Sequence, residues 1–191
     1  MRILRLITAL ISIPVIFISC TPAPPAQEQQ PAIPEGEKKI IATVYNSGFE
    51  HSHDTYNGLS TTADGKVYYV LCSELMDVAG QMYCLDPATQ KIEHVGDLTE
   101  MAGEKDMKVV AQGKSHVNFW ELENKLYFST HLGYYSIING MEMPGVPTGD
   151  YKPYRGGHLL VYDRVTKKSE SLAIAPGGEG ILTMTMDTKR G

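Results

Sequence analysis

Two stretches of the sequence decide the fold, GKVYYVLCS at residues 65–73 and QMYCLDP at residues 81–87. Each occurs a second time in similar form, as NKLYFSTH at residues 124–131 and HLLVYDR at residues 158–164. The first pair is offset by 59 positions (65 to 124) and the second by 77 (82 to 159), so the second copy carries an insertion of 18 residues. Short alternating apolar runs recur throughout, whereas no long stretch has the 3.6-residue period of a helix.

Each copy of this repeat predicts four short strands joined by turns. The predicted strands are 58–64, 66–73, 81–87 and 91–98 in the first copy, and 117–123, 125–131, 158–164 and 167–175 in the second. Four strands per unit with a period of about 60 residues are typical of a β-propeller blade. We therefore predict an all-β fold: a partial β-propeller of about two four-stranded blades, with the start of a third at residues 182–187.

A propeller closes with roughly four to eight blades, which is more than this chain supplies. Either the chain is the N-terminal piece of a longer protein, or several copies must assemble. We favour the first, with the remaining blades of a longer chain as partners.

The first twenty residues, MRILRLITALISIPVIFISC, form a separate segment. Arg2 and Arg5 precede an apolar run over residues 6–18, the order of a signal peptide, and the run is short for a membrane-spanning helix. It ends in a small residue and Cys20, which resembles a bacterial lipobox. Lipidation of Cys20 would anchor the chain to a membrane. A plain cleaved signal and an uncleaved anchor are the alternatives.

A proline-rich tether follows at residues 21–37, with five prolines among residues 21–36 and no aromatic residue. Such a composition favours a semi-extended linker over a packed core. The predicted order is a lipoprotein signal peptide (1–20), the tether (21–37) and an incomplete propeller domain (38–191). It indicates a protein of the bacterial cell envelope, an outer-membrane lipoprotein that faces the periplasm or the cell surface.

The composition excludes several classes of protein. A chain of 191 residues with 42% hydrophobic and 20% charged residues is typical of a folded domain. Its 17 Lys and Arg against 22 Asp and Glu give a net charge of −5, so we expect no nucleic-acid partner. Three cysteines cannot form a multi-disulfide scaffold. Cys72 and Cys84 lie on neighbouring predicted strands, where a disulfide could form, although we expect two buried thiols.

The long segments of the predicted blades all fall at one end of the fold, opposite the tight turns. They are residues 99–115, 132–157 and 176–181. His116, His131 and His158 map to the same end, where functional loops cluster on rigid scaffolds. The offsets align His131 with Cys72 and His158 with Gln81, so these histidines do not recur between the copies. A lone histidine is more often structural, and the cluster is what favours a site.

Histidine, tyrosine and arginine side chains together suit β-elimination from a uronate-containing glycan. A cation neutralises the carboxylate, one side chain removes the adjacent proton, and another protonates the leaving oxygen. The candidate catalytic residues are His116, Tyr134, Tyr135 and Arg155, and the candidate substrate-binding residues are His53, Lys152 and Tyr154. Alternatively, His116, His131 and His158 could hold a divalent metal that acts as the neutralising group.

Three short strings in this region resemble a known group of proteins. They are GKSH at 113–116, STHLGYY at 129–135, and GGH at 156–158 with its following Tyr162-Asp163 turn. Over residues 50–191 the chain is similar to bacterial secreted propellers of the oligogalacturonate lyase and rhamnose–glucuronate lyase kind. The resemblance implies a seven-bladed full-length protein, a lyase acting on uronate glycans, and a divalent ion, Mn or Ca, at His116, His131 and His158.

A non-catalytic protein is the competing hypothesis. A lipid-anchored propeller could capture glycans or scaffold an envelope complex without chemistry. An enzyme loses turnover but keeps its fold when His116 or His131 is replaced by alanine, whereas a binding module forms no product at any concentration.

Overall fold

The computed structural model describes residues 41–187 and 189–190. The chain divides into two units between Thr43 and Val44, and all that follows concerns the second. The predicted signal peptide (1–20), its Cys20 and the tether (21–37) lie outside the described residues. Among the residues that are described, no helix is both long and apolar enough to cross a membrane.

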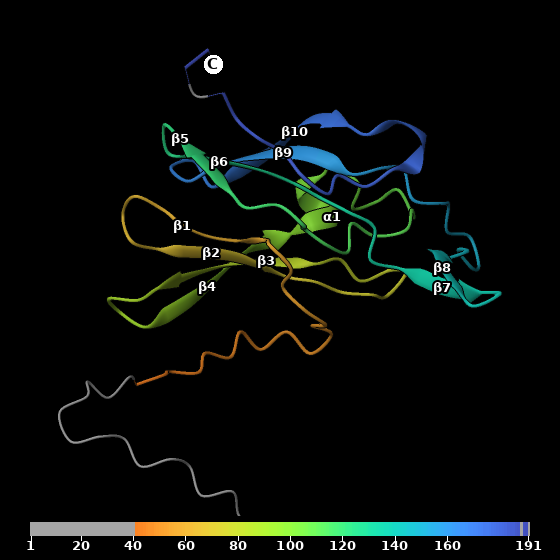
Figure 1. The fold of residues 1–191 in the computed structure, drawn as a ribbon, viewed down its shortest axis with the longest axis horizontal. Coiled ribbons are helices and arrows are strands. Elements are labelled where there is room, and N and C mark those ends of the chain that lie inside the picture. The colour runs from red at the N-terminus through yellow and green to blue at the C-terminus, as the bar shows by residue number, and fades with distance from the viewer. Residues whose placement is uncertain (1–40, 188, 191) are drawn as a thin grey trace, which may run out of the picture. The chain divides into compact units, whose positions relative to one another are not determined.

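The described chain is nearly all-β and contains two four-stranded antiparallel sheets (Figure 1). The elements are β1 (Leu59–Thr61), β2 (Val67–Leu71), β3 (Gln81–Asp86), β4 (Lys91–Asp97), α1 (Leu98–Met101), β5 (Trp120–Leu122), β6 (Lys125–Ser129), β7 (Tyr135–Ile138), β8 (Met141–Pro144), β9 (His158–Asp163), β10 (Lys168–Ile174) and the 3₁₀ helix η1 (Pro176–Gly178). The first sheet has the order β1-β2-β3-β4, and the second has the order β5-β6-β9-β10. The eight strands expected from the repeat are therefore confirmed, and neither sheet is closed.

Equivalent aspartates end the third strand of each sheet and shape the turn that follows. Asp86 Oδ1 accepts a hydrogen bond from the Ala88 N–H at 2.9 Å, and Asp163 Oδ1 accepts one from Val165 N–H at 2.9 Å. Such Asx turns reverse the chain within a few residues. The matching Asp residues of the repeat are thus explained by turn chemistry.

The core lies between the two sheets. Its buried side chains include Tyr68, Val70, Met82 and Cys84 from the first sheet, and Leu126, Phe128, Leu160 and Tyr162 from the second. Along β2 and β6 every second residue enters this core, as the two-residue period of a strand requires. Each fully buried side chain of this size contributes about 1.5–3 kcal/mol to folding. Cys72 and Cys84 are free buried thiols, as expected.

Two segments differ from the sequence expectation. Residues 132–157, expected as a loop, contain a hairpin in which β7 pairs with β8. Its turn is Asn139-Gly140, with positive φ at both residues (53° and 78°), the strongest short hairpin signal. Residues 182–187, expected to start a third blade, form no strand because no neighbouring strand supplies hydrogen bonds; Met184 instead packs against the core.

The tight turns and the long segments gather at opposite ends of the two sheets. At the turn end, Arg164 forms ion pairs with Asp64 and Glu121, which joins the second sheet to the first. At the other end, Lys114 and His131 exchange backbone hydrogen bonds of 3.0 and 2.8 Å. The long segments that the sequence placed at one end are therefore in contact there.

Candidate functional site

Close backbone packing at this end joins two of the long segments, 99–115 and 132–157, to the loop 72–80 between β2 and β3. Gly113 lies against Gly133 and against the carbonyl of Ser73, whose N–H donates to the Gly113 carbonyl at 2.9 Å. A Cβ on Gly113 would be 2.6 Å from both the Gly133 Cα and the Ser73 oxygen, so only glycine fits. This contact sets the positions of the polar side chains on either side of it.

Lys114 supplies a buried positive charge at this junction. Its side chain is 4% exposed, and its Nζ donates to Glu74 Oε1 at 2.6 Å and to the Tyr56 hydroxyl at 3.1 Å. The ammonium also lies 4.9 Å from the Tyr56 ring centre and 5.5 Å from that of Tyr135. Burial would lower the pKa of Lys114, but these partners raise it above its ordinary value, so the group stays charged.

His116 and His131 are adjacent, and Tyr56 stacks on the first. The Tyr56 and His116 rings are stacked, with their centres 4.2 Å apart. The His116 and His131 ring centres are 4.6 Å apart, and the planes of these two rings are inclined at 64° in an edge-to-face arrangement. Burial, then the charges of His131 and Lys114, lower the pKa of His116 below its ordinary 6.5. His116 is therefore neutral at pH 7. Within the described chain neither of its ring nitrogens has a hydrogen-bond partner.

His116 opens onto a cavity of about 230 Å³. The cavity lining also includes Asn57, Asn118, Trp120 and Thr183. Amide and hydroxyl groups beside an aromatic ring are a surface that can bind a sugar by hydrogen bonds and stacking. The cavity thus gives His116 access to a ligand.

Tyr135, the first residue of β7, reaches the second histidine. Its hydroxyl lies 3.2 Å from His131 Nδ1, which is also 2.9 Å from the Leu132 carbonyl oxygen. A carbonyl oxygen can only accept, so the geometry assigns a proton to His131 Nδ1. Burial raises the pKa of Tyr135, so its phenol keeps its proton at neutral pH.

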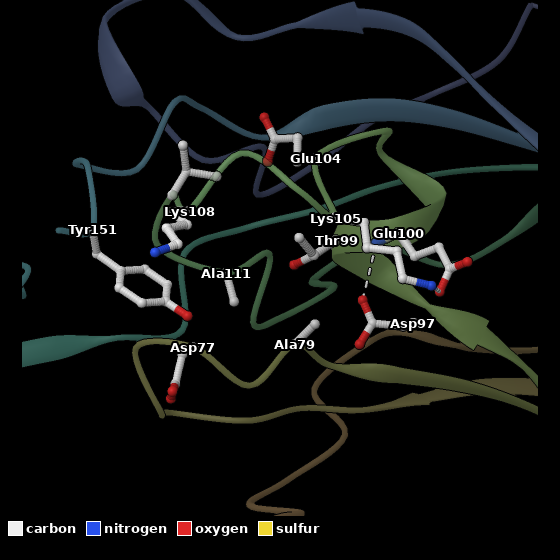
Figure 2. A pocket seen from close by; sticks show the side chains of 11 residues that line it. Asp77, Ala79, Asp97, Thr99, Glu100, Glu104, Lys105, Lys108, Ala111 and Tyr151 are labelled. Atoms are coloured by element: carbon white, nitrogen blue, oxygen red, sulfur yellow. Dashed lines mark hydrogen bonds and ion pairs between the residues drawn. The ribbon is translucent and has the colours of Figure 1, made fainter.

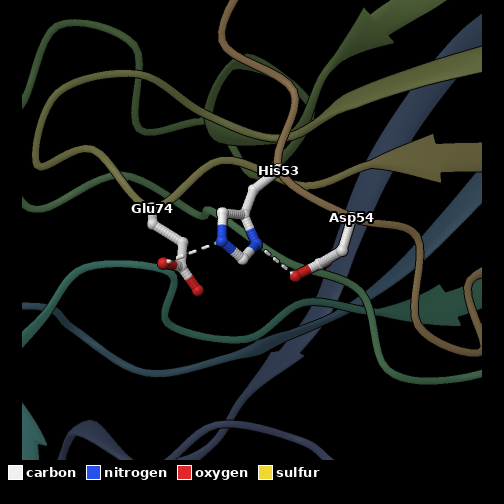
Figure 3. A group of neighbouring side chains, drawn as sticks. All are labelled: His53, Asp54 and Glu74. Atoms are coloured by element: carbon white, nitrogen blue, oxygen red, sulfur yellow. Dashed lines mark hydrogen bonds and ion pairs between the residues drawn. The ribbon is translucent and has the colours of Figure 1, made fainter. Parts of the chain in front are cut away.

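His53 forms a second polar group with Asp54 and Glu74 (Figure 3). Its Nδ1 is 2.6 Å from Asp54 Oδ2, and its Nε2 is 3.4 Å from Glu74 Oε2. The three side chains are close enough to share an ion. Glu74 is already paired with Lys114, whose positive charge opposes binding of a cation here.

A separate network surrounds the fully buried carboxylate of Glu104. Glu104 Oε1 accepts from His158 Nε2 at 3.0 Å and from Arg155 at 2.9 Å, and Oε2 accepts from Gln112 at 2.8 Å. Ser171 Oγ lies 2.6 Å from the other His158 nitrogen, Nδ1. Burial would raise the pKa of Glu104, but the hydrogen bonds from His158 and Gln112 lower it overall. All these polar atoms have partners, as expected of a structural cross-link.

Thr130 and Tyr154 complete this network. The Thr130 hydroxyl donates to Gln112 Oε1 at 2.6 Å and accepts from the His158 N–H at 2.8 Å, and the Tyr154 hydroxyl donates to the same Gln112 oxygen at 2.8 Å. Burial raises the pKa of Tyr154 far above its ordinary value. The network therefore ties the long segments to β9 without presenting a reactive group.

The structure divides the residues expected to form one site. His116, His131 and Tyr135 lie together, and His53 joins them through Glu74 and Lys114. His158, Arg155 and Tyr154 belong to the Glu104 network instead. Both ring nitrogens of His158 are occupied there, so the three-histidine metal arrangement is not assembled within the described chain.

The other two residues lie apart from the histidine pair. Tyr134 packs against Gly145 of its own hairpin. Lys152 forms an isolated parallel β-bridge with Val109. Together with Arg155 it also lines a different cavity of about 480 Å³. A substrate at His116 would therefore not be held by either residue through a contact seen in this structure.

Another cavity, of about 190 Å³, lies beside α1 (Figure 2). Several of its charged side chains already have partners: Asp97 caps α1 through the Glu100 N–H, and Glu100 pairs with Lys105 at 2.9 Å. These contacts explain the residues as helix-capping and surface groups, and this cavity is not the candidate site.

Sequence reasoning missed Lys114, Tyr56 and Glu74. Lys114 stands two residues before His116, and in an extended segment residues i and i+2 share a face. Its place beside His116 could therefore have been predicted once His116 was taken as a site residue. Tyr56 and Glu74 come from distant segments, and their approach depends on the tertiary fold.

No protein-family model matches this chain, and no curated protein or solved structure is detectably similar to it.

Proposed function

We propose that the chain is part of a lipid-anchored β-propeller of the bacterial envelope that binds uronate-containing glycans and cleaves them by β-elimination. The observation that carries this proposal is the combination of Lys114, His116 and Tyr135 at one end of the sheets. They provide a charged ammonium, a neutral imidazole and a protonated phenol at pH 7. These are the three states that the reaction needs.

The reaction divides among these groups as follows. The Lys114 ammonium, exchanging its contact with Glu74 for the substrate carboxylate, stabilises the charge that develops on it. His116 removes the proton from the carbon next to the carboxylate, and the released electron pair forms a double bond to the neighbouring carbon. The bond from that carbon to the glycosidic oxygen breaks, and the Tyr135 phenol protonates the leaving oxygen. Lys114 therefore neutralises the substrate carboxylate, the role for which the sequence suggested Arg155. The Arg155 guanidinium is instead paired with Glu104.

A divalent ion such as Mn or Ca could replace the lysine as neutralising group, with His116 and His131 as ligands. The lysine version is favoured because the Lys114 charge next to the pair opposes a cation there. Activity that survives a strong chelator supports the lysine version.

The propeller architecture rests on the repeat and on the stacked four-stranded meanders. A non-catalytic glycan-binding propeller is the second candidate. It is favoured by Tyr56, which is 49% exposed while stacked on His116, as an aromatic platform for a sugar ring would be.

The test follows the ultraviolet absorbance of the unsaturated uronate product when the full chain is mixed with polygalacturonate or a glucuronate-containing glycan. We expect His116→Ala to reduce the rate about 100-fold or more, the usual contribution of a general base. His94→Ala is the matched control, because His94 lies on β4 and contacts Tyr83 away from this site. Product formation that is unchanged in His116→Ala contradicts the assignment; glycan binding without product supports the second candidate.

The pH dependence gives an independent check. A general base acts only when unprotonated, and the pKa of His116 lies below 6.5. The pH at which the rate is half-maximal on the acid side should therefore lie below 6.5. A half-maximal rate at pH 6.5 or above would show that a different group is the base.

A further inference from the structure

Glu74 has two basic side chains of the candidate site as neighbours. Its Oε1 accepts from Lys114 Nζ at 2.6 Å, and its Oε2 lies 3.4 Å from His53 Nε2. The Glu74 side chain is 39% exposed, whereas that of Lys114 is 4% exposed. Within the described chain no other side chain donates to this carboxylate. Glu74 is therefore the accessible member of its ion pair, and a second basic group is within its reach.

The backbone beside Glu74 is held in place, so a change of partner needs only the side chain to move. The Ser73 N–H donates to the Gly113 carbonyl at 2.9 Å, and Ser73 Oγ accepts from the Leu75 N–H at 3.2 Å. These bonds join the loop that carries Glu74 to the residue before Lys114. Rotation about the side-chain bonds of a glutamate between staggered positions then moves its carboxylate from one neighbour to another.

His53 is oriented to receive this carboxylate. Its Nδ1 lies 2.6 Å from Asp54 Oδ2. Burial would raise the pKa of Asp54, but its partners, His53 first among them, lower it overall, so Asp54 is charged at pH 7. A carboxylate only accepts, which assigns a proton to His53 Nδ1. The other nitrogen, Nε2, faces Glu74 (Figure 3) and donates to it once it also carries a proton, as histidine can near neutral pH.

Charge balance makes Glu74 a competitor of an anionic ligand. Lys114 and Glu74 are neutral as a pair, and a second carboxylate on the same ammonium would be repelled by the first. A ligand carboxylate therefore replaces Glu74 instead of joining it. A neutral sugar hydroxyl carries no charge to compensate the ammonium, so the same exchange would leave a buried charge unpaired, which is strongly unfavourable.

We propose that Glu74 is a gate that makes the site specific for carboxylate ligands: it holds Lys114 when no ligand is bound, and it turns to His53 when a uronate carboxylate takes its place. His53, which the sequence suggested as a substrate-binding residue, then acts through Glu74 and does not contact the ligand. The gate rests on the proposed function for the identity of its ligand, a uronate, but it requires no cleavage.

The test measures the dissociation constant of galacturonate by NMR titration of the full chain in non-ionic detergent at about pH 6, where histidine can carry its second proton. Galacturonate has the carboxylate but no glycosidic bond to cleave. Glu74→Gln should bind it about five- to tenfold more tightly than the unaltered chain, because a neutral amide competes less for Lys114. Galactose, the neutral analogue, should bind both proteins equally.

Glu93→Gln is the matched control for the change in net charge. It removes a carboxylate that pairs with Lys167 on β4, away from the site, and should leave the affinity for galacturonate unchanged. Circular dichroism checks that each variant folds, and Glu74→Ala replaces Glu74→Gln if the latter does not.

His53→Ala should have the opposite effect. We expect galacturonate to bind it about threefold or more weakly, because the displaced Glu74 loses its second partner. In the Glu74→Gln background the same substitution should change nothing, since His53 acts only through the carboxylate that is then missing. A purely structural role of the two residues would not give effects of opposite sign.

Three results overturn the gate: equal galacturonate affinities of the unaltered chain and Glu74→Gln, no binding to either protein, or a His53→Ala effect that persists in the Glu74→Gln background. The last would show that His53 contacts the ligand itself. Ultraviolet absorbance of the product reports on cleavage separately. Tighter galacturonate binding by a Glu74→Gln chain that forms no product supports the gate and contradicts the lyase, whereas product formation with equal affinities contradicts the gate alone.

Discussion

At the scale of single residues, Glu104 shows how burial and hydrogen bonding together decide the role of an ionisable group. Its side chain is 0% exposed and accepts from His158, Arg155 and Gln112. A buried carboxylate without such donors would be strongly unfavourable, so these partners are required for it to stay charged. The segment that carries Glu104 is thereby fixed to β9, which begins at His158.

Replacing this carboxylate should destabilise the protein. We expect Glu104→Gln to lower the free energy of unfolding by about 2 kcal/mol or more at pH 7, because hydrogen bonds to a charged acceptor are lost inside the protein. Urea denaturation measures the change. Glu100→Gln is the control, since that carboxylate is 58% exposed and should change stability by about 0.5 kcal/mol at most. Equal effects of the two substitutions would contradict the structural role of the Glu104 network.

The same residue predicts how stability depends on pH. Because the folded-state pKa of Glu104 is below its ordinary 4.5, its contribution is complete above pH 4.5 and is lost as the pH falls through the folded value. The stability difference between the unaltered chain and Glu104→Gln should therefore shrink as the pH drops below 4.5. Denaturation curves at several pH values check this. A stability difference between the two proteins that stays constant down to pH 2 would show that Glu104 does not cause the loss of stability in acid.

Residue types at the candidate site were only partly predictable. His116 was recognised by its place at the end where the long segments gather, Tyr135 by its place in the insertion, and His131 because its repeat equivalent is Cys72. His158 was recognised by the same criterion, but it forms a structural pair, since nothing in the sequence indicates that Glu104 reaches it from 54 residues away.

At the scale of elements, glycines set how closely the long segments approach. A Cβ on Gly133 would overlap the carbonyl oxygen of Ser73 and would press on the Gly113 Cα. Both obstacles are backbone atoms, which cannot turn aside as a flexible side chain can. The position of Tyr135 at the start of β7 depends on this junction two residues earlier.

Gly133→Ala should therefore destabilise the protein by about 1–3 kcal/mol, the usual cost of overpacking. Thermal unfolding measures the loss. Gly140→Ala is the matched control: its φ of 78° carries a cost of about 1 kcal/mol, but nothing lies within 4 Å of the added Cβ. A loss for Gly133→Ala no larger than for Gly140→Ala would mean that the junction relaxes easily.

The strands themselves were predictable because each depends on local information. Alternation and the turn-forming aspartates identify eight strands. The register of the strand pairs that tight turns join, β1–β2, β3–β4, β5–β6 and β9–β10, follows from those turns. The β7–β8 hairpin was missed although Asn139-Gly140 indicates it, because the search for blade strands treated the whole insertion as a loop.

At the scale of the whole molecule, the two sheets are joined at both ends as well as through the core. At the turn end, Arg164 pairs with Asp64 and Glu121 and lies over the Tyr68 ring, with 11% of its side chain exposed. Asp64 lies in a turn of the first sheet and Arg164 in a turn of the second. The Arg164 side chain therefore links two turns that are 100 residues apart in the sequence.

Arg164→Ala should lower the free energy of unfolding by about 1.5–3 kcal/mol, since it removes charge-assisted hydrogen bonds together with the packing of a mostly buried side chain over Tyr68. Chemical denaturation at low and high salt measures this. Lys167→Ala is the control, because its 3.5 Å pair with Glu93 is mostly exposed and should contribute less than about 1 kcal/mol. An Arg164 effect no greater than that of Lys167 would show that the core alone joins the sheets.

The sequence by itself determined the strands, their turns, the two-copy repeat and the end of the fold at which the long segments gather. These features depend on alternation and on turn residues, which act over a few neighbouring positions. Only the tertiary structure decided which face of each copy is buried, and which histidines share a site. Both depend on contacts between residues that are distant in the chain, where a one-residue change of register reverses every side chain.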